Sequence, residues 1–310
     1  MRVFLAGATG VIGRRLVPML LAEGHQVTGM TRTPERLAAL QAQGADAVLA
    51  DALDADAMRA AVLEARPDAV IHQLTALPAR IDPRKMQRDL ALTDCLRSAG
   101  TRNLVDAARA AGARRLVAQS IAFAYAPGAP GTLHREEDPL FLDAPEAFRR
   151  SVHAVRDLEV AVLGAGGLVL RYGYFYGPGS AISSTGSMAA DIARRRLPIV
   201  GGGAGVWSFV HVDDAARATL LALTHGASGT YNVVDDEPAR VAEWIPALAA
   251  ALSAPKPMRV PAVLARLAAG SYGVSLMTSS QGASGELAAR ELDWKPAHPS
   301  WREGFRVALG

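Results

Sequence analysis

Short apolar runs alternate with amphipathic segments along the first half of the chain. Runs such as RVFLAGA are typical of strands that are buried on both faces of a parallel sheet. The pattern predicts strands over residues 2–8, 26–32, 46–51, 68–74, 114–125 and 168–179, the last two including a loop. Helices are predicted over residues 10–23, 35–44, 54–65, 92–112 and 148–165. This alternation indicates an α/β fold with a doubly wound parallel sheet.

The alternation loosens after Tyr172, where loops, short helices and prolines mix. The segment GTYNVVDDEP, residues 229–238, is consistent with a late strand of the sheet. We therefore expect a sheet domain over residues 1–171 and a smaller lobe over residues 172–310. The lobe is expected to be interleaved with late sheet elements at about residues 205–235.

The composition is that of an ordinary globular chain: half of the 310 residues are hydrophobic, a fifth are charged, and the formal net charge is +3. No basic block is present, so a nucleic-acid partner is not expected. Cys95 is the single cysteine, which excludes an intramolecular disulfide and is typical of the reducing cytoplasm. Neither a signal-peptide pattern nor an apolar run of membrane-spanning length is found, so we expect a cytoplasmic protein without a membrane partner.

The segment GATGVIG follows the first predicted strand and opens a helix. Gly7 permits a sharp turn, Gly10 lets the backbone approach a pyrophosphate, and Gly13 lets the helix pack closely on the sheet. The helix N-terminus offers free N–H groups to the phosphates. This context favours a dinucleotide site over a purely structural turn, and it includes the intervening residues Thr9, Val11 and Ile12.

The end of the second strand carries Arg32 and no carboxylate that would hold the 2′-hydroxyl of NAD. Arg32 can pair with a 2′-phosphate, with help from Arg14, so the sequence predicts NADP(H); the alternative is that Arg32 is a solvated loop residue. After the third strand, Asp51 is placed to meet the adenine ring beside Ala52. An equally good interpretation makes Asp51 the cap of the next helix.

Several motifs in the same order resemble an extended short-chain dehydrogenase/reductase of the epimerase/dehydratase type. They are GATGVIG, LADALD, GTRNLVDAA, LRYGYFYGPG, FVHVDDAARA, YNVVDDEP and the final ELDWKPAHPSWREGF. The resemblance implies a Rossmann domain with a smaller C-terminal substrate lobe, a nicotinamide cofactor and a homodimer. Residues at the ends of strands four, five and six are then expected to border the cofactor: Leu74, Thr75, Ser120, Tyr172 and Phe175.

Members of this family carry a Tyr-x-x-x-Lys pair, in which tyrosine exchanges the proton and lysine holds the nicotinamide ribose. The chain has three lysines, and the residues four positions before them are Ile81, Leu252 and Glu291, so the pair is absent. Placement against Glu159 puts Ser151 and Val155 at the two positions. The family's serine after strand five is replaced by Ile121, next to Ser120.

Another hydroxyl group near the expected site could take over the role of proton donor. The candidates for a catalytic role are Tyr125, Ser120, Ser151, Tyr174 and Tyr176. In an extended segment, Tyr172, Tyr174 and Tyr176 share one face, although packing between sheet and lobe is the commoner role of such rings. No metal site is expected, because no His/Asp cluster has a compelling spacing.

The loop over residues 124–148 is long and rich in proline, which suggests a flap over the site. His134, Glu136, Glu137 and Asp138 are candidates to face a substrate, although each one by itself is expected to be solvated.

The function predicted from these features is an NADP(H)-dependent oxidoreductase. It transfers hydride to or from a small-molecule C=O, C=N or activated C=C bond with a non-standard proton donor. One alternative is a non-catalytic NADP(H)-binding sensor or scaffold, because all three usual catalytic positions are altered. Another is a sugar-type epimerase or dehydratase, although that chemistry uses the missing tyrosine.

Overall fold

The computed structural model describes residues 1–309 and side chains as far as Val307. Its centre is a seven-stranded sheet in the order β11-β6-β5-β4-β1-β2-β3, in which every pair is parallel. The strands are β1 (Arg2–Ala6), β2 (Gln26–Thr31), β3 (Asp46–Leu49), β4 (Ala69–His72), β5 (Arg115–Ile121), β6 (Leu168–Tyr172) and β11 (Gly229–Val233). The predicted doubly wound sheet is confirmed.

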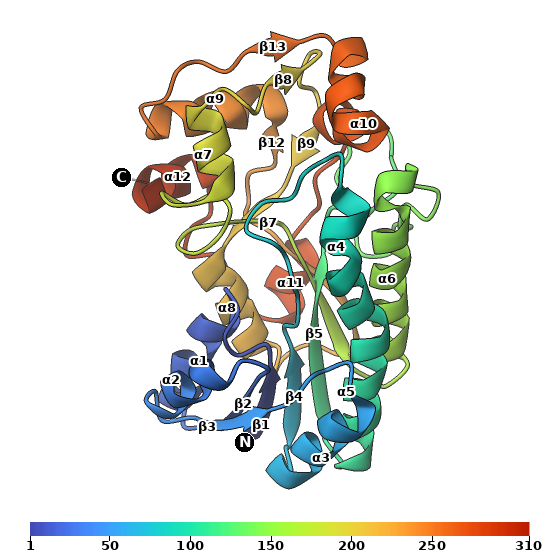
Figure 1. Cartoon of the computed structure of the whole chain (residues 1–310), viewed down its shortest axis with the longest axis vertical. Coiled ribbons are helices and arrows are strands. Elements are labelled where there is room, and N and C mark those ends of the chain that lie inside the picture. Colours follow the sequence, from blue (N-terminus) through green and yellow to red (C-terminus); the bar gives the residue numbers. More distant parts are fainter. Residues whose placement is uncertain (310) are drawn as a thin grey trace.

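Helices cover both faces of the sheet (Figure 1). Successive residues of β1 alternate between two cores: Val3 and Leu5 face one, Phe4 and Ala6 the other. The first core is closed by α1 (Gly13–Ala22), α8 (Val212–Leu221) and α11 (Glu286–Glu291). The second is closed by α3 (Ala55–Ala65), α5 (Thr101–Ala110) and α6 (Glu146–Leu163). The second strand leads into η1 (Pro34–Arg36) and α2 (Leu37–Gln41).

The helix predicted over residues 92–112 begins earlier, at Met86, and is not uniform. It consists of α4 (Met86–Cys95), a π-helical turn η2 (Leu96–Gly100) and α5. Asp94, Arg97 and Thr101 occur at roughly one-turn intervals along it, and all three are buried. A polar stripe of this helix is therefore enclosed within the domain.

A lobe lies beyond the carboxyl ends of the parallel strands (Figure 1). Its helices are α7 (Ser187–Ala193), α9 (Val241–Ala251), α10 (Ala262–Thr278) and α12 (Trp301–Leu309). Three small sheets pair β7 (Tyr174–Tyr176) with β10 (Phe209–His211), β9 (Val206–Trp207) with β12 (Ala239–Arg240), and β8 (Ile199–Val200) with β13 (Arg259–Val260). Its core is aromatic and includes Trp207, Phe209, Trp244, Trp301 and Phe305. Among residues 1–309, no helix combines the length and apolar character needed to cross a membrane.

Candidate active site

The glycine-rich turn lies at the carboxyl end of β1 and leaves no room for side chains. Gly7 has a φ of 91°, and a Cβ there would lie 2.6 Å from the carbonyl oxygen of Gln73. A Cβ on Gly13 would lie 2.2 Å from the carbonyl oxygen of Gly7. Gly10 is exposed at the tip, where its N–H bonds to that same oxygen at 3.0 Å. This compact turn at the start of α1 fits the pyrophosphate of a dinucleotide.

Arg32 follows β2 directly and is exposed, as a 2′-phosphate ligand requires. Arg14 is exposed too, but its Nη2 lies 3.4 Å from the Cβ position of Gly179. Arg36, which was not predicted from the sequence as a site residue, donates from Nη1 to Thr9 Oγ1 at 3.2 Å. Its side chain therefore reaches back to the glycine-rich turn and adds a cation beside Arg32.

Asp51 and Ala52 follow β3 at the same edge. Asp51 is exposed and accepts a bond of 3.0 Å from the N–H of Leu53. The cap of α3 is Asp54, whose Oδ1 accepts from Ala57 N–H at 3.0 Å, so the interpretation of Asp51 as that cap is wrong. Ala52 is buried. The adenine contact of Asp51 remains a prediction.

The end of β4 brings polar groups to the switch point between β4 and β1. His72 Nε2 bonds to Thr101 Oγ1 at 2.9 Å, and burial lowers the pKa of His72 to about 4. Gln73 donates from Nε2 to the hydroxyl of Tyr172 at 3.1 Å. Leu74 is half-buried and Thr75 is exposed. Ligands of parallel α/β sheets bind at this place.

Ser120 is engaged in a buried ionic network behind the site. Its Oγ donates to Glu159 Oε1 at 2.7 Å. Arg171 grips the same carboxylate with both Nε and Nη2, at 2.8 and 2.6 Å. A bidentate pair of this kind fixes geometry, and the Ser120 hydroxyl is committed to it.

Ser151 and Val155, the altered positions of α6, are both buried. Ser151 Oγ donates to Asp94 Oδ2 at 3.1 Å, whereas Asp94 Oδ1 has no partner within the described chain. Burial raises the pKa of Asp94. The position of the family tyrosine is thus occupied by the short side chain of Ser151, whose hydroxyl points toward the carboxyl group of Asp94 on α4.

The candidate tyrosines are separated rather than aligned on one face. β6 ends at Tyr172 and β7 begins at Tyr174, and the intervening Gly173 has its Cβ position 2.6 Å from the carbonyl oxygen of Ser208. Tyr172 bonds to Thr219 at 2.6 Å within the sheet domain, and Phe175 packs against it with ring centroids 5.4 Å apart. The expectation of one shared face is wrong because the strand is interrupted here.

Tyr174 and Tyr176 belong to the lobe. Tyr174 is the middle ring of a stack, with centroids 4.2 Å from Phe123 and 3.9 Å from Trp207. Its hydroxyl is buried without a described partner, and burial raises its pKa. Tyr176 is fully buried against Phe305, and burial raises its pKa as well.

Tyr125 also has a hydroxyl group in use. It donates to Asn232 Oδ1 at 2.7 Å, its ring lies 4.8 Å from the Arg171 guanidinium carbon, and burial raises its pKa to about 12. His134 stacks on the ring at 4.6 Å and is buried, and Glu136 accepts from Asn232 N–H at 2.8 Å. The expectation that His134 and Glu136 are solvated is therefore wrong, because their loop is tied to the sheet.

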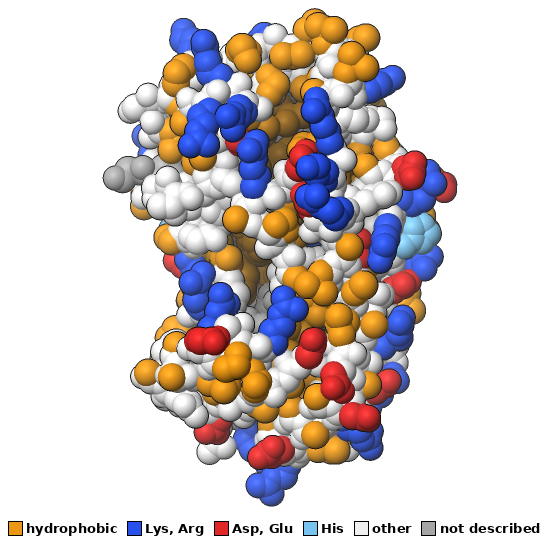
Figure 2. Space-filling model, viewed as in Figure 1, with side chains coloured by type: hydrophobic (Ala, Val, Ile, Leu, Met, Phe, Trp, Pro, Cys, Tyr) orange, Lys and Arg blue, Asp and Glu red, His pale blue; other side chains and the backbone are white. Residues whose placement is uncertain are grey.

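An aromatic pocket lies between this loop and the lobe. It is lined by Phe123, Tyr125, His134, Phe141, Tyr174, Trp207 and Tyr272, with Ser208, Ser275 and Gln281 among the polar residues. Figure 2 shows one face of the molecule, which is hollowed between the sheet domain and the lobe and has basic side chains beside the hollow.

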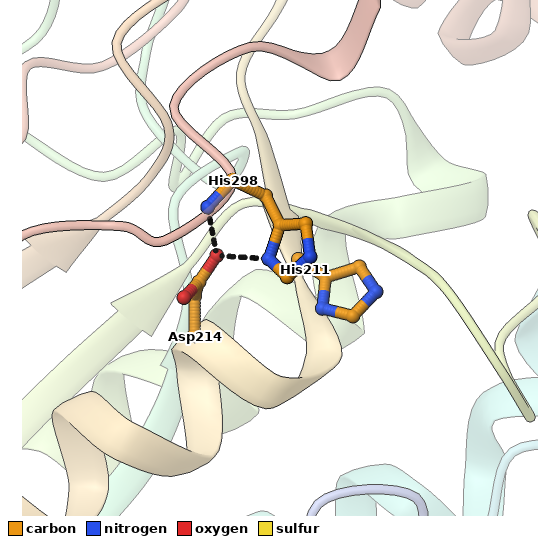
Figure 3. Close-up of side chains that lie close together, drawn as sticks. All are labelled: His211, Asp214 and His298. Atoms are coloured by element: carbon orange, nitrogen blue, oxygen red, sulfur yellow. Dashed lines mark hydrogen bonds and ion pairs between the residues drawn. The ribbon is translucent and has the colours of Figure 1, made fainter. Parts of the chain in front are cut away.

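His211, Asp214 and His298 meet at the N-terminal end of α8 (Figure 3). Their possible ligand atoms lie within 4.8 Å of one another, a cluster that sequence spacing did not reveal. Asp214 already accepts from the N–H groups of Ala297 and His298 at 2.8 and 2.9 Å, and from His298 Nδ1 at 2.9 Å. These bonds favour a clamp that holds the C-terminal segment on α8 over a metal centre.

The model of the NAD-dependent epimerase/dehydratase family matches residues 3–234, which is most of the chain. The chain belongs to this family. A "3-diazoavenalumate denitrifying reductase" of Streptomyces sp is 49% identical to the present protein, over 98% of this chain and 99% of the relative. A "2-alkyl-3-oxoalkanoate reductase" of Stenotrophomonas maltophilia is 27% identical over 83% of the chain and 77% of the relative.

Solved structures give the same assignment. A UDP-glucose 4-epimerase of Thermus thermophilus in complex with NAD has a TM-score of 0.76 and 25% identity, covering 100% of this family member and 98% of that chain. With reductases among its relatives, this family member is an NAD(P)-dependent oxidoreductase. This assignment disfavours the non-catalytic sensor or scaffold.

Proposed function

We propose that the protein is an NADPH-dependent reductase that removes a diazo group from an aromatic small molecule. The observation that carries the proposal is the 49% identity, over nearly both full lengths, to a reductase named for a diazo substrate and for denitrification. The diazo group is not among the C=O, C=N and C=C acceptors predicted from the sequence.

This reaction accounts for the missing proton donor. A reduced nicotinamide supplies a hydride. When the acceptor is a carbonyl, an alkoxide forms and an acid must be near it. When it is an aryl diazonium, the carbon–nitrogen bond breaks, N₂ leaves, and the hydride electrons end in a new C–H bond. The overall balance is aryl–N₂⁺ plus H⁻ giving aryl–H plus N₂, and no proton from the protein enters it.

The side chains around the site support the absence of an acid. Burial raises the pKa of Tyr125 and Tyr172 to about 12, opposite to the direction that general-acid catalysis at neutral pH requires. Ser151 has no lysine beside it, because Val155 occupies that position. A reaction driven by hydride transfer and loss of N₂ is compatible with this environment.

The residues present fit a nicotinamide dinucleotide. Gly7, Gly10 and Gly13 would receive the pyrophosphate, and Asp51 would meet the adenine ring. Arg32 and Arg36 would pair with a 2′-phosphate, which is why we propose NADPH rather than NADH.

The aromatic pocket would take the substrate ring. Its present volume is about 40 Å³, well below the roughly 150 Å³ of a cavity that binds benzene, so a ring requires side chains to move. Tyr272 lines it from α10, a helix interrupted at Gly270, where φ is 68°. We propose that this kinked helix shifts when an aromatic substrate enters and that the ring stacks beside Tyr174.

The test uses the purified protein, NADPH and a ¹⁵N₂-labelled diazo-hydroxybenzoate. We expect loss of NADPH absorbance together with equimolar ¹⁵N₂, measured by mass spectrometry, above a blank with heat-denatured protein. A parallel panel of aldehydes, ketones, imines and enones should be reduced far more slowly. Rapid turnover of that panel with ¹⁵N₂ release at the blank level would contradict the proposal.

We also propose a homodimer that acts in the cytoplasm. Leu92 on α4 and Val160 on α6 leave 38% and 64% of their surfaces exposed, and such apolar positions suit a helix interface. Light scattering of the purified protein measures its mass directly, and a monomer at micromolar concentration would exclude the interface.

A further inference from the structure

Arg97 is a buried cation without a partner. It is 8% exposed, and within the residues whose side chains the structure describes its guanidinium makes no hydrogen bond or ion pair. A guanidinium carries five N–H donors, and leaving them unpaired away from water is costly. Unlike Asp94 Oδ1, none of its nitrogens is among the fully enclosed polar atoms that lack a partner. Its nitrogens therefore keep some accessible surface.

The neighbours of Arg97 define its place. It stands in the π-helical turn η2, a kind of distortion that is frequent at functional sites. One turn earlier, Asp94 bonds to Ser151 on α6; one turn later, Thr101 bonds to His72 at the end of β4. Arg97 thus lies between the altered helix and the carboxyl edge of the sheet.

Two carboxylates face Arg97 without touching it. Asp94 and Glu159 both attract its charge through space, and Glu159 in turn holds Ser120 at the end of β5. Glu159 lies one helical turn after Val155, the position of the family lysine. A cation is therefore present in the same polar cluster from which the lysine has been lost, although it comes from another helix.

We propose that Arg97 binds the nicotinamide half of the cofactor in place of the lysine missing at Val155. This rests on the cofactor use of the family and not on the diazo substrate. The substrate pocket does not include Arg97 among its lining residues, and the end of β4 is where a dinucleotide crosses the sheet. Arg97 is then a cofactor-binding residue.

The competing explanation is that Arg97 only balances the buried charge of Asp94. Titration calorimetry with two ligands separates the two roles. NADP⁺ contains the nicotinamide half, whereas adenosine 2′,5′-bisphosphate contains only the adenine half. Arg97→Gln should weaken NADP⁺ binding about 10- to 100-fold, the range for hydrogen bonds to a charged group, and change bisphosphate binding less than about 2-fold.

A matched control is Arg150→Gln. Arg150 also approaches Asp94, at 3.9 Å, but its side chain is 61% exposed. This variant should bind both ligands as the parent protein does. Unchanged NADP⁺ affinity in Arg97→Gln, or equal loss of both ligands, would overturn the proposal.

Folding failure does not leave the question open. If Arg97→Gln does not fold, Arg97→Lys keeps the charge but loses the planar fork. It should weaken NADP⁺ alone by about 3- to 10-fold, since only part of the hydrogen bonding is lost, and equal affinity would count against the proposal. These titrations need no turnover, so failure of the diazo reaction would leave their outcome intact.

Discussion

Ser151 donates a hydrogen bond to Asp94 across the interface of α6 and α4, with 3.1 Å between Oγ and Oδ2. In this bond the residue at the position of the family tyrosine holds α6 against α4 and does not act as a proton donor to a substrate. Asp94 has a second oxygen without a described partner, so the serine is the hydroxyl donor on which this carboxyl group relies. The serine that replaces the family tyrosine thus has a structural role, because it supplies a hydrogen bond to a buried carboxyl group.

Ser151→Ala should therefore destabilise the protein more than an ordinary surface change. Removing the donor leaves a buried carboxyl group without its bond, which costs about 1–3 kcal/mol of unfolding free energy. Urea unfolding followed by circular dichroism measures the difference. Ser184→Ala, at an exposed position before α7, serves as control and should change stability by less than about 0.5 kcal/mol. Equal stability of the two variants would show that the Ser151 bond contributes nothing.

Cofactor preference should depend on Arg36 as well as on Arg32. Both lie at the end of β2, and Arg36 already bonds to Thr9 of the glycine-rich turn. Arg36→Ala and Arg32→Ala should each weaken NADPH binding about 10-fold through loss of a charge-assisted bond, while NADH affinity stays unchanged.

Fluorescence titration with both cofactors provides the measurement for these two arginines. Arg59→Ala, on the exposed side of α3, is the control and should alter neither affinity. Parallel loss of NADH and NADPH affinity in the Arg36 variant would assign Arg36 to the shape of the turn instead of the 2′-phosphate.

Two of the three tyrosines that line the pocket form a matched pair for testing proton donation. Tyr125 donates to Asn232, whereas the Tyr174 hydroxyl is buried without a described partner. Tyr125→Phe should cost about 1–2 kcal/mol because the Asn232 oxygen loses its donor, and Tyr174→Phe should be neutral or stabilising.

Catalysis should respond differently from stability in this pair. With no proton required from the protein, kcat for the diazo substrate should remain within about 3-fold of the parent value in both variants, since general acids contribute about 100-fold or more. A kcat that falls by two orders of magnitude in one variant would identify that tyrosine as the proton donor and argue for a carbonyl-type reaction.

Local patterns predicted the sheet well because each strand of the sheet domain is a separate apolar run bounded by turn residues. The site was harder to predict from the sequence because its contacts join segments that are far apart along the chain. Asp94 and Ser151 are 57 residues apart, and Asp214 and His298 are 84 apart, so only the tertiary fold brings each pair together. Arg97 could have been found, since Asp94, Arg97 and Thr101 recur at helical spacing in a helix expected to pack on a sheet.

Stability should fall with rising pH because of Asp235. Both of its oxygens are buried without described partners, and burial raises its pKa to about 9. Unfolding returns the carboxyl group to water, where its pKa is near 3.9. Between these values the folded protein holds a proton that the unfolded chain releases, so this group weakens the folded state by up to about 1.4 kcal/mol per pH unit.

Asp235→Asn removes that dependence, because the amide does not titrate. The unfolding free energy of the variant relative to the parent should rise between pH 5 and pH 8, as measured by urea titration at each pH. Asp236→Asn is the control. The Asp236 side chain is exposed, so the difference in unfolding free energy between this variant and the parent should stay constant over this interval. A constant difference for Asp235→Asn as well would mean that Asp235 is already ionised in the folded protein, with water or a cation reaching it beside Tyr176.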